Sequence, residues 1–173
     1  EIVVPFTSEK AIKALRAGMR VSLTGSLIVM RDAAHHLLYE QMKAGEPLPL
    51  DLTNEVVFYA GPTPAKANRA VGAIGPTTSA RMDRYTPFLL EQGLKGMIGK
   101  GKRSEEVKRA IVHHKAVYFV AIGGIAALLS QRVTSESVIA FAHLGTEAIR
   151  RITVEKFPCI VVNDIYGNDF YIK

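Results

Sequence analysis

The chain has 173 residues, of which 48% are hydrophobic and 22% charged, which is typical of one globular domain and too apolar for a disordered segment. Its 22 Lys and Arg residues against 16 Asp and Glu residues give a net charge of +6. The basic residues are spread along the chain among acids, which favours a small anionic ligand over a nucleic acid.

The cysteine and histidine content limits the metal chemistry that this chain can support. Cys159 is the single cysteine, so no internal disulfide can form, and we expect a reducing, cytoplasmic location. One cysteine and five histidines, four of them in adjacent pairs, do not supply the ligands of a zinc or iron–sulfur site. Any metal would therefore have to come from another chain. The longest uncharged apolar run, residues 116–129, has 14 residues, whereas a bilayer span needs about 20.

Hydrophobic periodicity, capping residues and Gly or Pro breaks predict the elements of the first half of the chain. In order, these are a strand at 2–4, a helix at 8–16, two short strands within 20–30, a helix at 31–43 and a buried strand at 56–60. Gly25 lies between the two short strands and indicates a bulge or a close backbone approach. Residues 66–76 form a polar loop of a length usually reserved for function. Residues 77–79 then offer N-cap hydroxyls before a helix that runs to Gly93.

Strands become more frequent toward the end of the chain. In order, we expect a short strand from Gly96 that leads into a turn, a helix at 104–112, a strand at 117–122, a turn at Gly123 and Gly124, a helix at 125–131, a strand at 137–141, a helical turn at 146–150, and strands at 152–154, 160–162 and 170–172. Strands and helices alternate in the middle, and strands dominate both ends. This pattern predicts one mixed α/β domain over residues 1–173 and leaves the order of the strands open.

Two polar clusters stand where a predicted helix begins. Arg31, Asp32 and His35 follow a predicted strand, and they form either a functional group or a solvated helix start in which Asp32 offsets the helix dipole. Residues 75–83 place three hydroxyls after a Gly-Pro turn, with Arg81 one turn later. Free backbone N–H groups and a guanidinium would form an anion site there, and the alternative is a helix cap with a surface arginine.

A third cluster, residues 99–104, is rich in Gly and Lys but is not a nucleotide-phosphate loop. The G-x-x-x-x-G-K-[ST] pattern would need Gly at Leu94 and Ser or Thr at Gly101, and no G-x-G-x-x-G occurs. Lys100, between two glycines on a tight turn, can still point at a ligand that approaches the backbone closely.

These clusters belong to a longer series of motifs. In chain order the series comprises Thr24-Gly25, Arg31 to His35, Ala60 to Pro64, Gly75 to Asp83, Gly99 to Gly101, Tyr118-Phe119 with Gly123-Gly124, Glu147 to Ile149, Phe157-Pro158 and Asp164 to Asn168. The series resembles the β subunit of the iron–sulfur-dependent class I fumarases and L(+)-tartrate dehydratases, which is the C-terminal domain in single-chain members. The resemblance covers nearly the whole chain and is most specific at residues 77–83.

The resemblance implies a fold, a partner and a cofactor. The fold would be a single swivelling β/β/α domain with mixed sheets and flanking helices. A partner α subunit, in an αβ or α2β2 assembly, would hold a [4Fe–4S] cluster through three cysteines and leave one iron open to substrate. This chain alone would bind no cofactor, and no nucleic acid or membrane partner is implied.

The resemblance also assigns site residues. The dicarboxylate-binding residues would be Arg31, Thr78, Arg81 and Lys100, the catalytic residues Thr77, Arg81 and Lys100, and the supporting residues Asp32, His35 and Asp83. Thr77 stands at the family position for proton transfer at carbon. Arginine forks and a lysine place positive charge where negative charge grows, which favours the transition state. An unperturbed hydroxyl is a weak base, and Arg81 could supply the positive charge that activates Thr77.

The implied reaction is the reversible hydration of fumarate to (S)-malate. Met82 and Asp83 after Arg81, together with residues 100–104, are closer to the fumarase branch than to the tartrate branch. The alternative is an L(+)-tartrate dehydratase β subunit, which would act in the conversion of tartrate to oxaloacetate. Two further readings are a non-catalytic anion-binding α/β module and a self-sufficient enzyme. Binding of a polyanion by such a module would weaken steeply with salt, and the self-sufficient enzyme would need neither partner nor iron.

Overall fold

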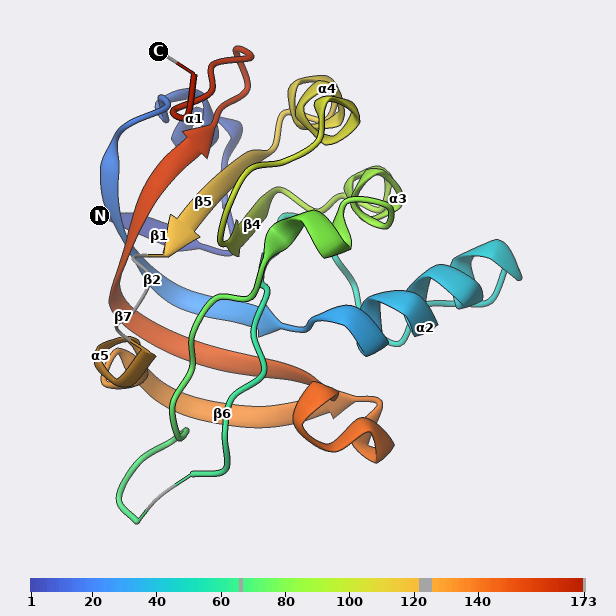
Figure 1. The fold of residues 1–173 in the computed structure, drawn as a ribbon, viewed down its shortest axis with the longest axis vertical. Helices are drawn as coiled ribbons and strands as arrows, with labels where there is room; N and C mark the ends of the chain where they lie inside the picture. Colours follow the sequence, from blue (N-terminus) through green and yellow to red (C-terminus); the bar gives the residue numbers. More distant parts are fainter. Residues whose placement is uncertain (66, 122–125, 173) are drawn as a thin grey trace.

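A computed structural model of the protein describes residues 1–65, 67–121 and 126–172 (Figure 1). Its strands are β1 (Ile2–Val4), β2 (Arg20–Val29), β3 (Val56–Phe58), β4 (Gly96–Gly99), β5 (Val117–Ala121), β6 (Val133–Ala140) and β7 (Ile149–Asn163). Its α-helices are α1 (Glu9–Lys13), α2 (Asp32–Lys43), α3 (Thr86–Glu91), α4 (Glu105–His113) and α5 (Ala126–Ser130), and η1 (Ser79–Met82) and η2 (Ala142–Glu147) are 3-10 segments.

The long strand β7 closes the sheet into a ring. One edge of β7 pairs antiparallel with β2, from Arg150 opposite Val29 to Ile160 opposite Arg20, and the other edge pairs with β6 and β5. β2, β3, β4 and β5 pair in parallel in that order, and β1 adds to β2. The ring β2-β3-β4-β5-β7 has an inner and an outer face, so side chains that alternate along each strand pack into two separate cores.

The two cores are covered by different helices. The inner core includes Leu27, Val29, Phe58, Phe119 and Val161, with Ile12 from α1 and Leu129 from α5. The outer core includes Ile28, Val57, Tyr59, Met97 and Tyr118. It lies under α2, α3 and α4, which stand in a row along one side of the sheet (Figure 1). The loops that follow these strands are therefore held by a packed layer of helices and strands.

The prediction of a mixed α/β fold with a mixed sheet and flanking helices is confirmed. The prediction of two short strands within residues 20–30 is wrong, because the ladder between β2 and β7 continues past a register shift at Gly25. The close backbone approach expected at Gly25 is confirmed. Gly25 has φ of +128°, and a Cβ there would lie 1.9 Å from the carbonyl oxygen of Val4.

The tail of the chain also differs from the prediction. The strands expected at 152–154 and 160–162 are parts of the single strand β7, and residues 170–172 form no strand. Pairing with β2 keeps the chain extended through Pro158, where the sequence pattern is interrupted. The turn predicted at Gly123 and Gly124 lies outside the described residues. No helix within the described parts of the chain is both long and apolar enough to cross a membrane.

Candidate active site

Predicted site residues gather where the parallel strands β2, β3 and β4 end. Arg31 follows β2, Gly61 follows β3 after two residues, and Lys100 follows β4. Parallel neighbours end at the same edge of a sheet, so the loops that follow them meet. This edge is the usual ligand-binding side of sheets with parallel strands.

Residues 77–79 run between the ends of β3 and β4. The Thr77 N–H donates to the Tyr59 carbonyl at 2.8 Å, and the Ser79 N–H donates to the Lys100 carbonyl at 2.9 Å. Thr78 and Lys100 form an isolated parallel bridge. This backbone pairing brings the predicted residues Thr77 and Thr78 beside the Lys100 turn.

The same pairing makes the helix predicted from Thr77 wrong in its first half. The chain forms the four-residue 3-10 segment η1 and then the six-residue helix α3. The N–H groups of Thr77 and Ser79 are already bonded to the neighbouring strand ends, and Thr78 makes no side-chain cap bond to η1. Two of the N–H groups that the predicted anion site could use are therefore occupied by backbone carbonyls. Positive charge here comes from side chains.

Arg81 links the first two predicted clusters. Its Nε and Nη2 donate to the two carboxylate oxygens of Asp32 at 2.9 and 3.0 Å, and Nη2 also lies 2.5 Å from Thr77 Oγ1. The side chains of Arg81 and Asp32 are 50% and 43% exposed. Because a guanidinium has only donors, the Thr77 oxygen accepts this hydrogen bond, and its own proton remains free to be donated elsewhere.

Arg31 is held by an acid that was not predicted as a site residue. Its Nε lies 3.1 Å from Glu147 Oε1, which also accepts from the N–H of Ala33 at 3.4 Å. Gly61 packs against the guanidinium, since a Cβ there would lie 3.2 Å from Arg31 Nε. Glu147 is the last residue of η2, far along the chain from Arg31. The sequence signal that points to it is its place in the motif at residues 147–149.

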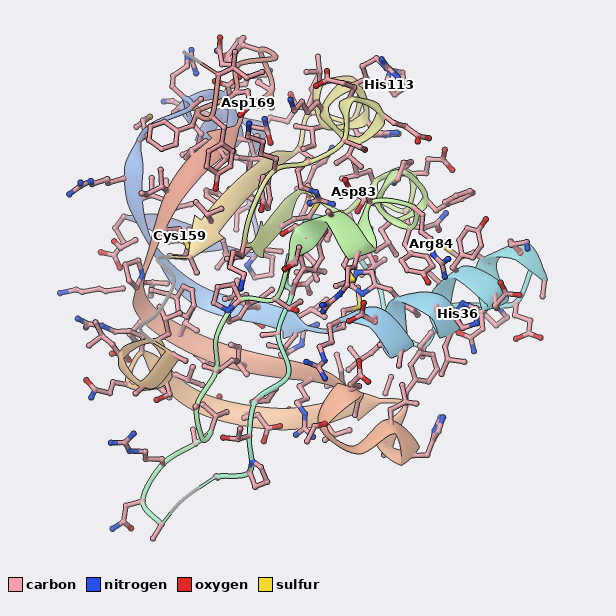
Figure 2. All side chains as sticks on the ribbon, in the orientation of Figure 1. His36, Asp83, Arg84, His113, Cys159 and Asp169 are labelled. Carbon is pink, nitrogen blue, oxygen red and sulfur yellow. The ribbon has the colours of Figure 1, made fainter. Side chains whose placement is uncertain are left out.

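The predicted supporting residue His35 is buried and does not face solvent. Its Nδ1 lies 2.8 Å from the Arg31 carbonyl oxygen, and its ring packs between those of Tyr59 and Tyr85. Burial lowers the pKa of His35 to about 4, so the ring is neutral at pH 7. With neutral imidazole, Nδ1 donates to the carbonyl, and His35 supports the backbone at Arg31. Its neighbour His36 is exposed on α2 (Figure 2).

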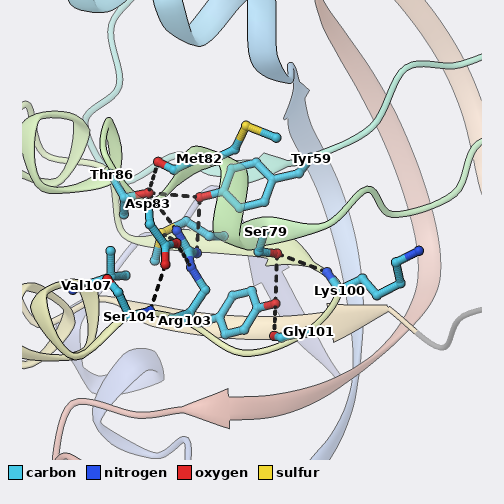
Figure 3. A network of polar contacts seen from close by, with 12 residues as sticks. Tyr59, Ser79, Met82, Asp83, Thr86, Lys100, Gly101, Arg103, Ser104 and Val107 are labelled. Atoms are coloured by element: carbon cyan, nitrogen blue, oxygen red, sulfur yellow. Dashed lines mark hydrogen bonds and ion pairs between the residues drawn. The ribbon is translucent and has the colours of Figure 1, made fainter.

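Asp83 takes part in a buried network around Arg103 (Figure 3). Its carboxylate accepts from Arg103 Nε and from the Ser104 N–H, both at 2.7 Å. The Arg103 side chain is fully buried, and it also donates to Tyr59 Oη at 3.2 Å and to Thr86 Oγ1 at 2.7 Å. The predicted supporting residue Asp83 thus pairs with a buried cation. Nothing in the sequence distinguishes Arg103 from the exposed basic residues beside it.

The side chains at the Lys100 turn remain open to solvent. Thr78 and Lys100 are exposed, and in Figure 3 the Lys100 side chain extends away from the buried network. The five cavities described for the chain, with volumes of about 170 to 480 Å³, are lined by other residues. In the described part of the chain, Arg31, Thr77, Arg81 and Lys100 thus stand at an open edge.

The described residues do not fit an iron–sulfur cluster. Among them, no three His, Cys, Asp or Glu side chains are grouped so that they could hold a metal ion. Cys159 lies on β7, and burial raises the pKa of its thiol well above the usual value, so it is an unreactive core residue (Figure 2).

Comparison with known proteins gives relatives along the whole chain. Residues 2–173 match the sequence family described as Fumarase C-terminus. The chain is 42% identical over 158 residues to fumarate hydratase 2 of Leishmania major, an alignment that covers 90% of this chain and 28% of the relative. It is 42% identical over 154 residues to the anaerobic class I fumarate hydratase of Escherichia coli, covering 88% of this chain and 28% of the relative.

A shorter relative matches along most of its own length. The putative L(+)-tartrate dehydratase subunit beta of Methanocaldococcus jannaschii is 36% identical over 170 residues, covering 95% of this chain and 87% of the relative. The chain therefore spans only 28% of the two fumarate hydratases but nearly the whole of a separate subunit.

Proposed function

Because the chain belongs to the Fumarase C-terminus family, we propose that it is the β subunit of an iron–sulfur hydro-lyase that reversibly hydrates fumarate to (S)-malate. In this proposal residues 1–173 act as one domain, and a partner α subunit completes the enzyme in an αβ or α2β2 assembly. The chain is inactive without that partner, and the assembly is cytoplasmic. The observation that carries the proposal is the group formed by Arg81, Thr77 and Asp32 at an open edge, where Arg31 directly precedes Asp32 in the chain.

Two arginines and a lysine bind the dicarboxylate in this proposal. Arg31 is held by Glu147 through Nε, and Arg81 is held by Asp32 through Nε and Nη2. These bonds orient the guanidinium groups and leave Nη1 of Arg81 and the terminal nitrogens of Arg31 for a carboxylate. Lys100 and Thr78 approach from the neighbouring turn, with exposed side chains. Positive charge on both sides of the substrate favours the transition state, in which negative charge grows on the carboxylate next to the reacting carbon.

Thr77 moves the proton at carbon in this proposal. Its oxygen accepts a hydrogen bond from the Arg81 guanidinium at 2.5 Å, which stabilises negative charge on that oxygen. The Thr77 hydroxyl proton is then the one exchanged with the substrate carbon. Because the described residues of this chain do not fit a [4Fe–4S] cluster, we assign the cluster to the α subunit.

The test is anaerobic hydration of fumarate, followed by the loss of fumarate absorbance. The chain is assayed alone, then mixed with a cluster-loaded α subunit. Activity only in the mixture supports the proposal, and turnover by the chain alone contradicts it. If neither preparation hydrates fumarate, the function proposed here fails, and the tartrate assay below becomes the next comparison.

The second candidate is an L(+)-tartrate dehydratase β subunit. The observation that favours it is the relative of that name, which this chain covers over 87% of its length. The same mixture is given L(+)-tartrate, and oxaloacetate is measured as product. A kcat/KM for tartrate above that for fumarate would replace the first candidate by the second. Salt-dependent binding of a polyanion without turnover of either substrate would instead indicate a binding module.

A further inference from the structure

We infer that Ser79 and Tyr118 are positioning residues that fix the Lys100 turn, and with it the direction of the Lys100 side chain. The inference rests on the proposed function, in which Lys100 binds the substrate. Neither residue faces the open edge: the exposed fraction is 0% for each (Figure 3). Their roles must therefore be exerted through the turn and not through contact with substrate.

The hydrogen bonds around the turn run in one direction. The Lys100 N–H donates to Ser79 Oγ at 3.0 Å, and Tyr118 Oη donates to the Gly101 carbonyl at 2.7 Å. The single Tyr118 proton is thereby used, so the 2.9 Å contact between the two hydroxyls is a bond donated by Ser79. The chain Lys100 N–H, Ser79, Tyr118, Gly101 carbonyl thus joins the backbone on both sides of Lys100.

The surroundings leave this chain of bonds little freedom. A Cβ at Gly99 would lie 1.9 Å from Ser79 Oγ, so the glycine is needed for the hydroxyl to reach the turn. The buried Arg103 guanidinium lies 4.9 Å from the centre of the Tyr118 ring, on its face. The Ser79 N–H also donates to the Lys100 carbonyl at 2.9 Å. Three groups, the hydroxyl and N–H of Ser79 and the hydroxyl of Tyr118, therefore hold the backbone from Lys100 to Gly101.

A fixed backbone at Lys100 aims its flexible side chain. A lysine side chain has many rotamers, and a fixed direction of its Cα–Cβ bond limits the positions that its ammonium group can reach. The same serine follows Thr77 and Thr78 directly, so both substrate-facing segments are tied to one hydroxyl. Loss of that hydroxyl would loosen the Lys100 turn without removing the lysine or the threonines, and only the backbone pairing between residues 78–79 and Lys100 would remain.

The test is a double-mutant cycle in the mixture of this chain with the α subunit, using Ser79→Ala, Lys100→Ala and both together. We expect Ser79→Ala to lower kcat/KM about tenfold, chiefly through KM, and to change it less than about twofold when Lys100 is already Ala. Equal losses in both backgrounds would overturn the inference, since they would indicate a general structural effect. Ser130→Ala, another buried serine whose hydroxyl donates to a carbonyl (Ala127, 2.7 Å), is the matched control.

A second measurement separates this inference from the proposed function. Amide hydrogen exchange of Lys100 in the same mixture should be at least tenfold faster in Ser79→Ala than in the wild type, whether or not the mixture turns over fumarate or tartrate. An unchanged exchange rate would overturn the inference that Ser79 fixes the Lys100 turn. An inactive wild-type mixture would overturn the proposed function alone. Tyr118→Phe, which keeps the ring and removes the hydroxyl, gives the same readouts if Ser79→Ala does not fold.

Discussion

Arg81 and Asp32, 49 positions apart in the sequence, form a two-bonded ion pair whose third contact is the Thr77 hydroxyl. The pair joins the start of α2 to the η1 segment, so the carboxylate at the helix start orients the guanidinium instead of only offsetting the helix dipole. An arginine that is held on one side by an acid is well suited to bind a substrate carboxylate on the other.

Removal of the Arg81 guanidinium should reduce turnover by the assembled enzyme. We expect Arg81→Ala to lower kcat/KM at least tenfold, because both carboxylate binding and the bond to Thr77 are lost. Arg84→Ala is the control, since Arg84 is exposed three residues later and lies on the Tyr85 ring. Near-wild-type kinetics of Arg81→Ala would remove this residue from the site.

Asp32→Asn should separate activity from stability. The pair is about half exposed, so we expect the free energy of unfolding to change by less than about 1 kcal/mol. We expect kcat/KM to fall about tenfold, because the guanidinium loses its orienting charge. Urea unfolding and steady-state kinetics measure the two effects. A large loss of stability with normal kinetics would show that Asp32 supports the fold and does not orient Arg81 for the substrate.

Glu147→Gln tests the residue that holds Arg31. Glutamine keeps an oxygen that can accept but removes the negative charge 3.1 Å from Arg31 Nε, so the guanidinium is held less firmly. We expect KM for the dicarboxylate to rise about three- to tenfold with a smaller change in kcat. Glu46→Gln, an exposed acid just beyond the end of α2, should leave both constants unchanged. Equal kinetics for the two variants would argue against a role for Glu147.

Asp83→Asn should destabilise the protein far more than Asp32→Asn does. It leaves the fully buried Arg103 guanidinium without its counterion, and breaking a buried ion pair costs about 3–5 kcal/mol. Urea denaturation gives the difference in free energy of unfolding between the two variants. If both aspartates gave the same small effect, Arg103 would have to be charge-compensated in some other way.

His35 should make stability fall in mild acid. Its pKa is about 4 in the folded chain, because the ring is buried, against 6.5 when unfolded. Between these pH values His35 binds more protons in the unfolded chain than in the folded one. The free energy of unfolding therefore declines as pH falls from 6.5 toward 4, by up to about 1.4 kcal/mol per pH unit.

The variant His35→Gln, which cannot titrate, isolates this contribution. Urea unfolding from pH 4.5 to 7.5 should give a shallower pH dependence for His35→Gln than for the wild type. His143→Gln, an exposed histidine, should follow the wild-type curve. Parallel curves for wild type and His35→Gln would show that the burial of His35 does not govern the acid response.

Local patterns in the sequence were sufficient where an element is stabilised by its own residues. The helix start at Ser104 is an example, since its hydroxyl accepts the Val107 N–H at 3.2 Å as the capping pattern predicts. The predicted helix after Thr77 failed because its first backbone N–H groups bond to β3 and β4 ends, which are distant in sequence. The division of residues 20–30 into two strands failed for the same reason, because β7 supplies partners on both sides of Gly25.

In the candidate site, too, local motifs could be recognised from the sequence, whereas contacts between distant segments could not. Arg31, Asp32, Thr77 and Arg81 stand in recognisable motifs, and the structure brings them to one edge. Glu147, Ser79 and Tyr118 also lie within the motif series, but their roles, like that of Arg103, depend on contacts that no spacing in the sequence encodes. Their burial and orientation depend on how separate strands align, so only the three-dimensional arrangement shows what each of them does.

The ring of strands has a consequence for how the protein is made. β2 is synthesised well before its antiparallel partner β7, and Arg20 must find Ile160 before the ring can close. Until then the growing polypeptide on the ribosome exposes an open strand edge and the apolar residues of the inner face. Such late, distant pairing folds slowly, so newly made chains should depend on chaperones more than helical proteins of this length do.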